Sequence, residues 1–160
     1  MKNHILSVLV ENKPAVLARV IGLVSGRGYN IETLNVAPTC DATTSRITMT
    51  VPGDDHVLEQ VTKQLNKLVD VIKVYDLAEG AYVDRELALV KVAATPRNRA
   101  ALIELAALFR GEVVSAQSKA LVIQVVGPTE TVDAFLEMIK PCGIAEASRT
   151  GVMAMGKRDA

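Results

Sequence analysis

The residues best suited to chemistry lie near the start of this 160-residue chain, where the apolar run 5–10 passes through Asn12 into a segment with helical periodicity. Pro14 suits the first position of a helix, because its missing N–H would be unpaired there and its φ is already helical. We therefore predict a helix that begins within one residue of Pro14, with Pro14-Ala15-Val16-Leu17 as its first turn. That turn has no acidic side chain, so its free N–H groups and the positive end of the helix dipole can bind an anion such as a carboxylate.

Asn12 can offer its side-chain amide to the same ligand. An amino-acid zwitterion needs N–H donors for its carboxylate, an oxygen for its ammonium group and a dry pocket for an aliphatic side chain. The helix start supplies the donors, and Val16, Leu17 and Ile31 would form the apolar wall. The alternative is that Asn12 only caps the helix or its entry turn, as Asn commonly does. The sequence leaves both interpretations open.

Asn30 is a second candidate. It follows Gly26-Arg27-Gly28, whose glycines are typical of a helix end and predict that the first helix ends there. Asn30 and Ile31 then lie at the opposite end of this helix from Asn12. Within a dimer, however, Asn30 of one subunit could meet Asn12 of the other across the interface.

Catalytic and metal-binding motifs are lacking. His4 lies at the start of a predicted strand and His56 in the first turn of a predicted helix, and neither has neighbours that suit a catalytic triad or a metal site. The pair Asp54-Asp55 is better explained as matching the dipole of a helix that starts there. Gly26 and Gly28 close a helix, whereas a dinucleotide-binding glycine loop opens one. We therefore expect no catalytic residue and no metal site.

Composition excludes further classes of partner. Eighteen basic residues balance eighteen acidic ones, and aromatic residues make up only 3%, which argues against nucleic-acid binding. The chain enters a strand almost at once rather than a signal sequence, and no apolar run approaches the ~18 residues of a membrane span. We expect a cytoplasmic protein that binds neither nucleic acid nor membrane, with Cys40 and Cys142 reduced.

Apolar periodicity divides the chain into two copies of a strand-helix-strand-strand-helix-strand pattern. The expected strands cover 5–10, 31–37, 45–51 and 71–75 in the first copy and 87–94, 112–115, 121–126 and 144–148 in the second. This order predicts an α+β protein with two ferredoxin-like βαββαβ domains, in which antiparallel sheets carry helices on one face. The expected boundaries are 1–76 for the first domain, 77–85 for a linker and 86–160 for the second domain. Some strands, such as 121–126, are apolar on both faces, so we expect a homodimer that covers the face away from the helices.

A set of motifs extends over nearly the whole chain and comprises Leu6–Pro14, Leu17–Val20, Arg27–Glu32, Ser45-Arg46, Gly53-Asp54, Gln64–Val71, Arg85–Val92, Phe109–Gly111 and Ser148–Gly151. Together these motifs closely resemble those of a known family, the small regulatory subunit of acetolactate synthase (acetohydroxyacid synthase) with its N-terminal ACT domain.

The resemblance implies a non-catalytic subunit that binds the catalytic large subunit, raises its activity and confers feedback inhibition by valine or another branched-chain amino acid. It places the effector at an interface between two ACT domains, with Asn12 and the helix start at Ala15-Val16 from one subunit and Asn30-Ile31 from the other. Thiamine diphosphate, FAD and magnesium would belong to the large subunit. The alternative is a free-standing amino-acid sensor of the ACT type, although the family-specific second half argues against it.

One position departs from the family pattern. The family usually has glycine where this chain has Ala15. Because Ala15 is expected in the first turn of the helix, it should stabilise the protein slightly relative to glycine, by up to about 1 kcal/mol. Its methyl group should hinder an effector that docks on the helix start.

Overall fold

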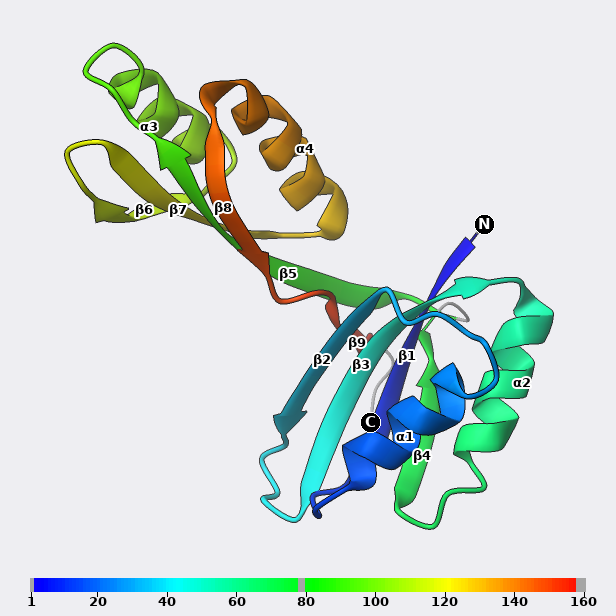
Figure 1. The fold of residues 1–160 in the computed structure, drawn as a ribbon. Helices are drawn as coiled ribbons and strands as arrows, with labels where there is room; N and C mark the ends of the chain where they lie inside the picture. Colours follow the sequence, from blue (N-terminus) through cyan, green and yellow to red (C-terminus); the bar gives the residue numbers. More distant parts are fainter. Residues whose placement is uncertain (1, 78–79, 158–160) are drawn as a thin grey trace. The chain divides into compact units, whose positions relative to one another are not determined.

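The computed structural model describes residues 2–77 and 80–157, which form two compact units. The first unit contains the chain up to Val83 together with the segment that begins at Val152, and the second contains Asp84–Gly151. Each unit holds an antiparallel sheet and two helices (Figure 1). The predicted α+β class with two ferredoxin-like domains is confirmed.

The first unit consists of a four-stranded antiparallel sheet, in the order β2-β3-β1-β4, whose two helices lie on one face (Figure 1). Val20 and Val24 of the first helix and Val61 of the second pack against Leu6 and Val8 of the central strand, and all five are fully buried. The elements are β1 (Lys2–Glu11), α1 (Val16–Ser25), β2 (Thr33–Pro38), β3 (Thr44–Gly53), α2 (Asp55–Leu65) and β4 (Val71–Asp76).

The second unit repeats this arrangement, with the strand order β6-β7-β5-β8. Its core centres on Phe135, whose ring meets that of Phe109 edge to face with the centroids 5.5 Å apart. The elements are β5 (Tyr82–Ala93), α3 (Arg99–Leu108), β6 (Glu112–Ala116), β7 (Ala120–Gly127), α4 (Thr129–Ile139), the 3-10 turn η2 (Lys140–Cys142) and β8 (Ile144–Arg149).

A strand that the sequence pattern did not indicate, β9 (Met153–Gly156), follows the second unit and pairs with β5. Val152 and Ala154 pack with Leu77 against Ile5 and Tyr75. Ile5 alternates with the buried Leu6 along β1, so this small cluster covers part of the sheet face opposite the helices. In the first unit the chain itself therefore covers part of a face that we expected another subunit to cover.

The compact units divide the chain differently from the expected domain boundaries in two places. Leu77 is buried and Tyr82 already belongs to β5, so 77–85 is not simply a linker; its residues 78 and 79 lie outside the described residues. The segment from Val152 lies in the first unit rather than in a second domain 86–160. Apolar periodicity could not reveal this, because β9 is short and its partner strand is distant in sequence.

The start of the first helix also differs from the prediction. Helix α1 begins at Val16, two residues after Pro14 rather than within one residue of it. The interpretation of Asp54 as a helix cap is confirmed, since its carboxylate accepts the N–H of Val57 at 2.9 Å.

Candidate functional site

The start of α1 differs from the predicted first turn in its backbone conformation. Ala15 has φ 65° and ψ −1°, in the left-handed region, so the regular helix begins only after it. In the described part of the chain, the N–H groups of Leu17 and Ala18 have no hydrogen-bond acceptor, and that of Val16 reaches the carbonyl oxygen of Lys13 at 3.4 Å. Unpaired N–H donors are therefore present, as expected, but they belong to Leu17 and Ala18 rather than to the turn 14–17 as a whole.

Asn12 does not cap this helix. Its backbone N–H donates to the carbonyl oxygen of Thr43 at 2.8 Å, and its side-chain Nδ2 donates to the carbonyl oxygen of Ala42 at 2.9 Å. The capping alternative is therefore wrong for α1, which has no side-chain cap. The side-chain oxygen of Asn12 has no donor among the described residues and can accept a hydrogen bond from an ammonium group.

The loop between β2 and β3, to which Asn12 is attached, is held by its own side chains. The carboxylate of Asp41 accepts hydrogen bonds from the backbone N–H of Thr43 at 2.9 Å and from its hydroxyl at 2.7 Å. These bonds stabilise the charged carboxylate and lower the pKa of Asp41, with the hydroxyl as the larger cause. The hydroxyls of Thr39 and Thr44 lie 2.6 Å apart and close the loop.

Charged side chains around the start of α1 are paired with one another. Lys13 donates to the carboxylate of Glu11 at 2.5 Å, a hydrogen bond that raises the pKa of Lys13. Arg19 binds Asp70 through Nε at 3.0 Å and Nη2 at 2.6 Å. Because these charges are already neutralised, the partial positive charge of the helix start is the main field that an anion would meet there.

The predicted apolar wall is only partly present. Val16 is 2% exposed, and its side chain packs into the core rather than facing solvent beside Leu17. Leu17 is 37% exposed, Ile31 is half-buried against the core, and Pro14 and Ala15 are exposed. The apolar periodicity of the helix did not show that Val16 is buried and Leu17 is exposed. The orientation of these side chains depends on where α1 begins, which is at Val16 rather than at Pro14.

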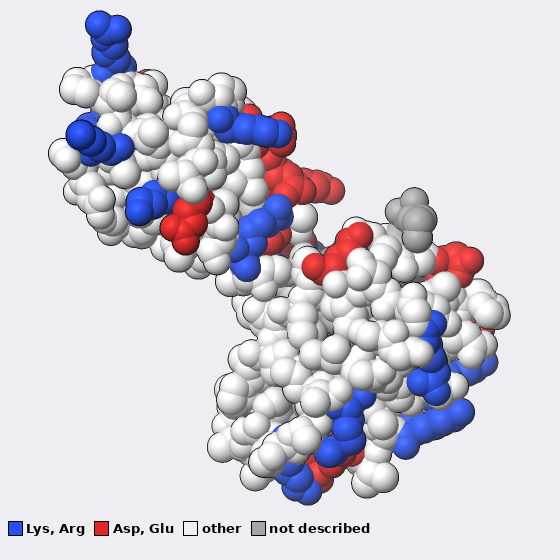
Figure 2. Space-filling model, viewed as in Figure 1, with Lys and Arg blue, Asp and Glu red and all other residues white. Residues whose placement is uncertain are grey.

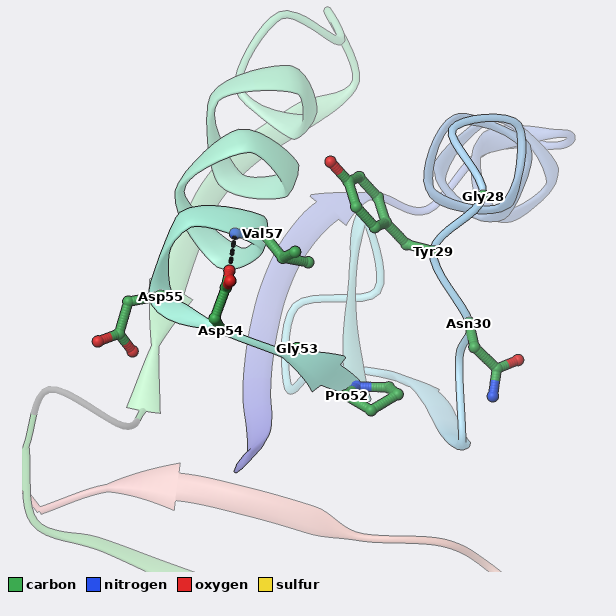
Figure 3. A pocket seen from close by; sticks show the side chains of 8 residues that line it. All are labelled: Gly28, Tyr29, Asn30, Pro52, Gly53, Asp54, Asp55 and Val57. Atoms are coloured by element: carbon green, nitrogen blue, oxygen red, sulfur yellow. Dashed lines mark hydrogen bonds between the residues drawn. The ribbon is translucent and has the colours of Figure 1, made fainter. Parts of the chain in front are cut away.

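Asn30 lies at the far end of α1, as the sequence predicted. It lines a hollow of about 610 Å³ between the end of α1 and the start of α2. Figure 3 shows Tyr29 leaning toward α2, whereas the Asn30 amide extends away from Asp54. The complete lining is Gly28, Tyr29, Asn30, Pro52, Gly53, Asp54, Asp55 and Val57. Within one chain the two halves of the predicted site therefore remain apart.

Both histidines lie away from the start of α1. His4 is 1% exposed, and its Nε2 lies 3.7 Å from the carboxylate of Asp55. His56 is exposed in the first turn of α2. The described residues contain no group of three or more His, Cys, Asp or Glu placed to hold a metal ion, and none of their helices is long and apolar enough to cross a membrane.

Sequence reasoning did not identify an ionic cluster at the start of β5. Glu86 has a side chain only 2% exposed and accepts hydrogen bonds from Arg149 Nε at 2.7 Å and Nη2 at 2.8 Å. A second carboxylate, that of Asp133 on α4, lies 2.8 Å from Arg149 Nη1. Both raise the pKa of Arg149, and Glu86 has the larger effect. The resemblance covered Glu86 and Arg149, but their pairing across 63 residues had no local signal.

Charged residues elsewhere are interspersed. On the face shown in Figure 2, patches of Lys and Arg and patches of Asp and Glu are scattered among a majority of uncharged residues. This agrees with the formal net charge of zero. The visible face therefore has no strip of one sign of charge of the kind that nucleic-acid binding requires.

The chain folds into two ferredoxin-like units. In the first unit, unpaired N–H groups at the start of α1 lie near Asn12, whose side chain is hydrogen-bonded to the β2–β3 loop. These features place the chain in the class of ACT-domain proteins. Residues 6–73 match the family described as "AHAS small subunit-like ACT domain", and residues 85–158 match "Small subunit of acetolactate synthase". The chain belongs to the acetolactate synthase small subunit family.

Individual relatives agree with this assignment. The chain is 49% identical over 155 residues to the "Probable acetolactate synthase small subunit" of Methanothermobacter thermautotrophicus, with 96% of this chain and 92% of the relative covered. It is 46% identical over 157 residues to the "Acetolactate synthase isozyme 3 small subunit" of Escherichia coli, with 98% and 96% covered. The crystal structure of the acetolactate synthase small subunit from Thermotoga maritima superposes with a TM-score of 0.90 at 34% identity, covering all of both chains.

Proposed function

We propose that this chain is the non-catalytic regulatory subunit of acetolactate synthase, which raises the activity of the catalytic large subunit and makes it sensitive to inhibition by valine or another branched-chain amino acid. The observation that carries the proposal is that both halves of the chain match this one family over nearly their whole length. A free-standing amino-acid sensor would need only the first half. The thiamine diphosphate, FAD and magnesium of the reaction belong to the large subunit.

The start of α1 supports an amino-acid effector in particular. The N–H groups of Leu17 and Ala18 can bind a carboxylate, and the side-chain oxygen of Asn12 can accept from an ammonium group. Leu17 offers an exposed apolar side chain that suits an aliphatic effector. Two chains paired through their ACT units would add Asn30 and Ile31 of the second chain, so that a homodimer holds two equivalent effector sites.

Titration of the large subunit from the same organism tests the regulatory role. The chain alone should form no acetolactate, whereas adding it should raise the turnover of the large subunit until the rate saturates, and valine should then lower that rate. A large subunit whose turnover is unchanged by a saturating excess of this chain would refute the regulatory role.

Calorimetry with valine tests the site. Asn12→Ala and Asn30→Ala should each weaken valine binding by about 10- to 150-fold, because each loses a hydrogen bond to a charged group worth roughly 1.5–3 kcal/mol. Asn66→Ala, which changes an exposed asparagine after α2, serves as the control and should bind like the wild type. Unchanged affinity in both test variants would place the effector elsewhere.

A further inference from the structure

Two basic side chains lie in one row across the face of the first sheet that is turned away from the helices. Leu9 of β1 pairs with Arg46 of β3 on one side and with Lys73 of β4 on the other. Leu9 alternates along β1 with the buried Val8 and Val10, which face the helices. The row Arg46-Leu9-Lys73 therefore lies on the same face as Ile5 and Ser7.

Both cations are positioned by neighbouring groups. The guanidinium carbon of Arg46 lies 5.8 Å from the ring centroid of Tyr75, and Nζ of Lys73 lies 4.8 Å from the same centroid. Arg46 Nη1 also donates to the hydroxyl of Ser7 at 2.8 Å, and Ser7 is 1% exposed. Stacking on an aromatic ring and a bond to a buried hydroxyl restrict the guanidinium, so it loses little freedom when it binds a partner.

Neither cation is neutralised within the chain. In the part of the chain that the structure describes, no ion pair joins Arg46 or Lys73 to a carboxylate. Two acidic residues near this end of the sheet are already engaged, Glu11 with Lys13 and Asp70 with Arg19. Among the described residues, these two positive charges therefore have no directly paired carboxylate.

Part of this row is open to a partner. Ala37 of β2, which pairs with Arg46, is exposed, whereas Arg46 itself is half-buried. Lys73 is exposed, and Leu9 and Tyr75 are half-buried. The cationic groups of Arg46 and Lys73 lie 5.8 Å and 4.8 Å from the centroid of the same Tyr75 ring, so neighbouring carboxylates of one polypeptide segment could reach both.

We propose that this basic face, formed by Leu9, Ala37, Arg46, Lys73 and Tyr75, is the docking surface for an acidic segment of the catalytic large subunit. The inference rests on the proposed function, because the large subunit is the partner. Carboxylates of that segment would pair with Arg46 and Lys73, with a bidentate pair favoured at the planar guanidinium. Its apolar side chains would cover Leu9 and Ala37.

The test measures activation of the large subunit from the same organism at increasing salt concentration. Arg46→Gln and Lys73→Gln should each raise the amount of small subunit needed for half-maximal activation by about two- to fivefold, and the double variant by about tenfold. The double variant should also lose most of the salt dependence, since its charges are gone. Lys67→Gln removes an exposed cation of the same unit that forms no ion pair with another described residue, and this variant should match the wild type.

Calorimetry with valine and thermal unfolding show whether each variant keeps its fold and its effector site. Lys73→Glu adds a test that leaves Arg46 and its buried partner untouched, and it should weaken activation more than Lys73→Gln. Suppose that the wild type activates the large subunit, and that the double variant and Lys73→Glu give the same titration curve as the wild type. The docking surface then lies elsewhere, and this inference fails while the proposed function stands. If the wild type itself gives no activation, the proposed function fails and the inference fails with it.

Discussion

Replacing Ala15 by glycine tests the backbone conformation at the start of α1. An L-residue with a side chain pays roughly 1–2 kcal/mol in the left-handed region, where Ala15 lies with φ 65°. Glycine removes this strain, but it also makes the unfolded chain more flexible, which costs about 0.4–1 kcal/mol. The difference predicts that Ala15→Gly raises the free energy of unfolding by about 0.5–1 kcal/mol.

This result has the opposite sign from the one that the sequence suggested. Inside a helix, glycine would lower the stability by up to about 1 kcal/mol relative to alanine. Urea unfolding and thermal unfolding can separate the two outcomes, because 1 kcal/mol shifts the melting temperature by roughly 2–4 °C in a chain of this length. A lower melting temperature for Ala15→Gly would show that Ala15 is not strained and would refute the argument.

Gly28 and Gly22 provide matched controls. Gly28 has φ +77° and no atom within 4 Å of the position that a Cβ would take. Gly28→Ala should therefore lower the free energy of unfolding by about as much as Ala15→Gly raises it. Gly22 lies inside α1 with the same open space around it, and Gly22→Ala should gain about 0.5–1 kcal/mol through helix propensity alone. If Gly28→Ala proves stabilising, positive φ carries no measurable cost in this protein.

The same variant also probes the proposed effector site. If the methyl group of Ala15 hinders the effector, Ala15→Gly should bind valine more tightly and strengthen feedback inhibition of the reconstituted enzyme. Inhibition curves that superimpose for the two proteins would show that Ala15 is a neutral replacement for binding. The stability prediction is independent of this outcome.

Two further predictions concern ionic groups. Arg149→Met should destabilise the protein by about 2–4 kcal/mol in urea unfolding, because it leaves the Glu86 carboxylate buried without its partner. The loss is limited because Arg149 itself is one-third exposed. Combining Glu86→Leu with Arg149→Met should recover most of the lost stability, and failure to do so would contradict the explanation. The lowered pKa of Asp41 means that its contribution to stability is present above its ordinary pKa of 3.8 and is lost as pH falls through the lowered value. An NMR titration should place the midpoint of Asp41 below 3.8, and Thr43→Val should move it upward; an unchanged midpoint would show that the hydroxyl is not the cause.

The architecture could be predicted from the sequence because its signals are local. Alternating apolar residues such as Leu6, Val8 and Val10 indicate a strand with one buried face, and Asp54 marks a helix start through its own side chain. The candidate site was predictable only in part. The position of Asn12 near a helix start could be read from the chain, but its hydrogen bond to Ala42 could not, because the loop that holds Ala42 is 30 residues away.

By itself the sequence determined the two βαββαβ units, the family and the separation of Asn12 from Asn30 by one helix, since each depends on neighbouring residues or on motifs. Only the tertiary structure decided that Ala15 adopts a left-handed conformation, that Val16 faces the core, and that β9 returns to the first unit. It also brought Glu86 to Arg149 and placed Arg46 and Lys73 over Tyr75. These features depend on strand register and on contacts between distant segments, and apolar periodicity carries no information about which distant residues meet.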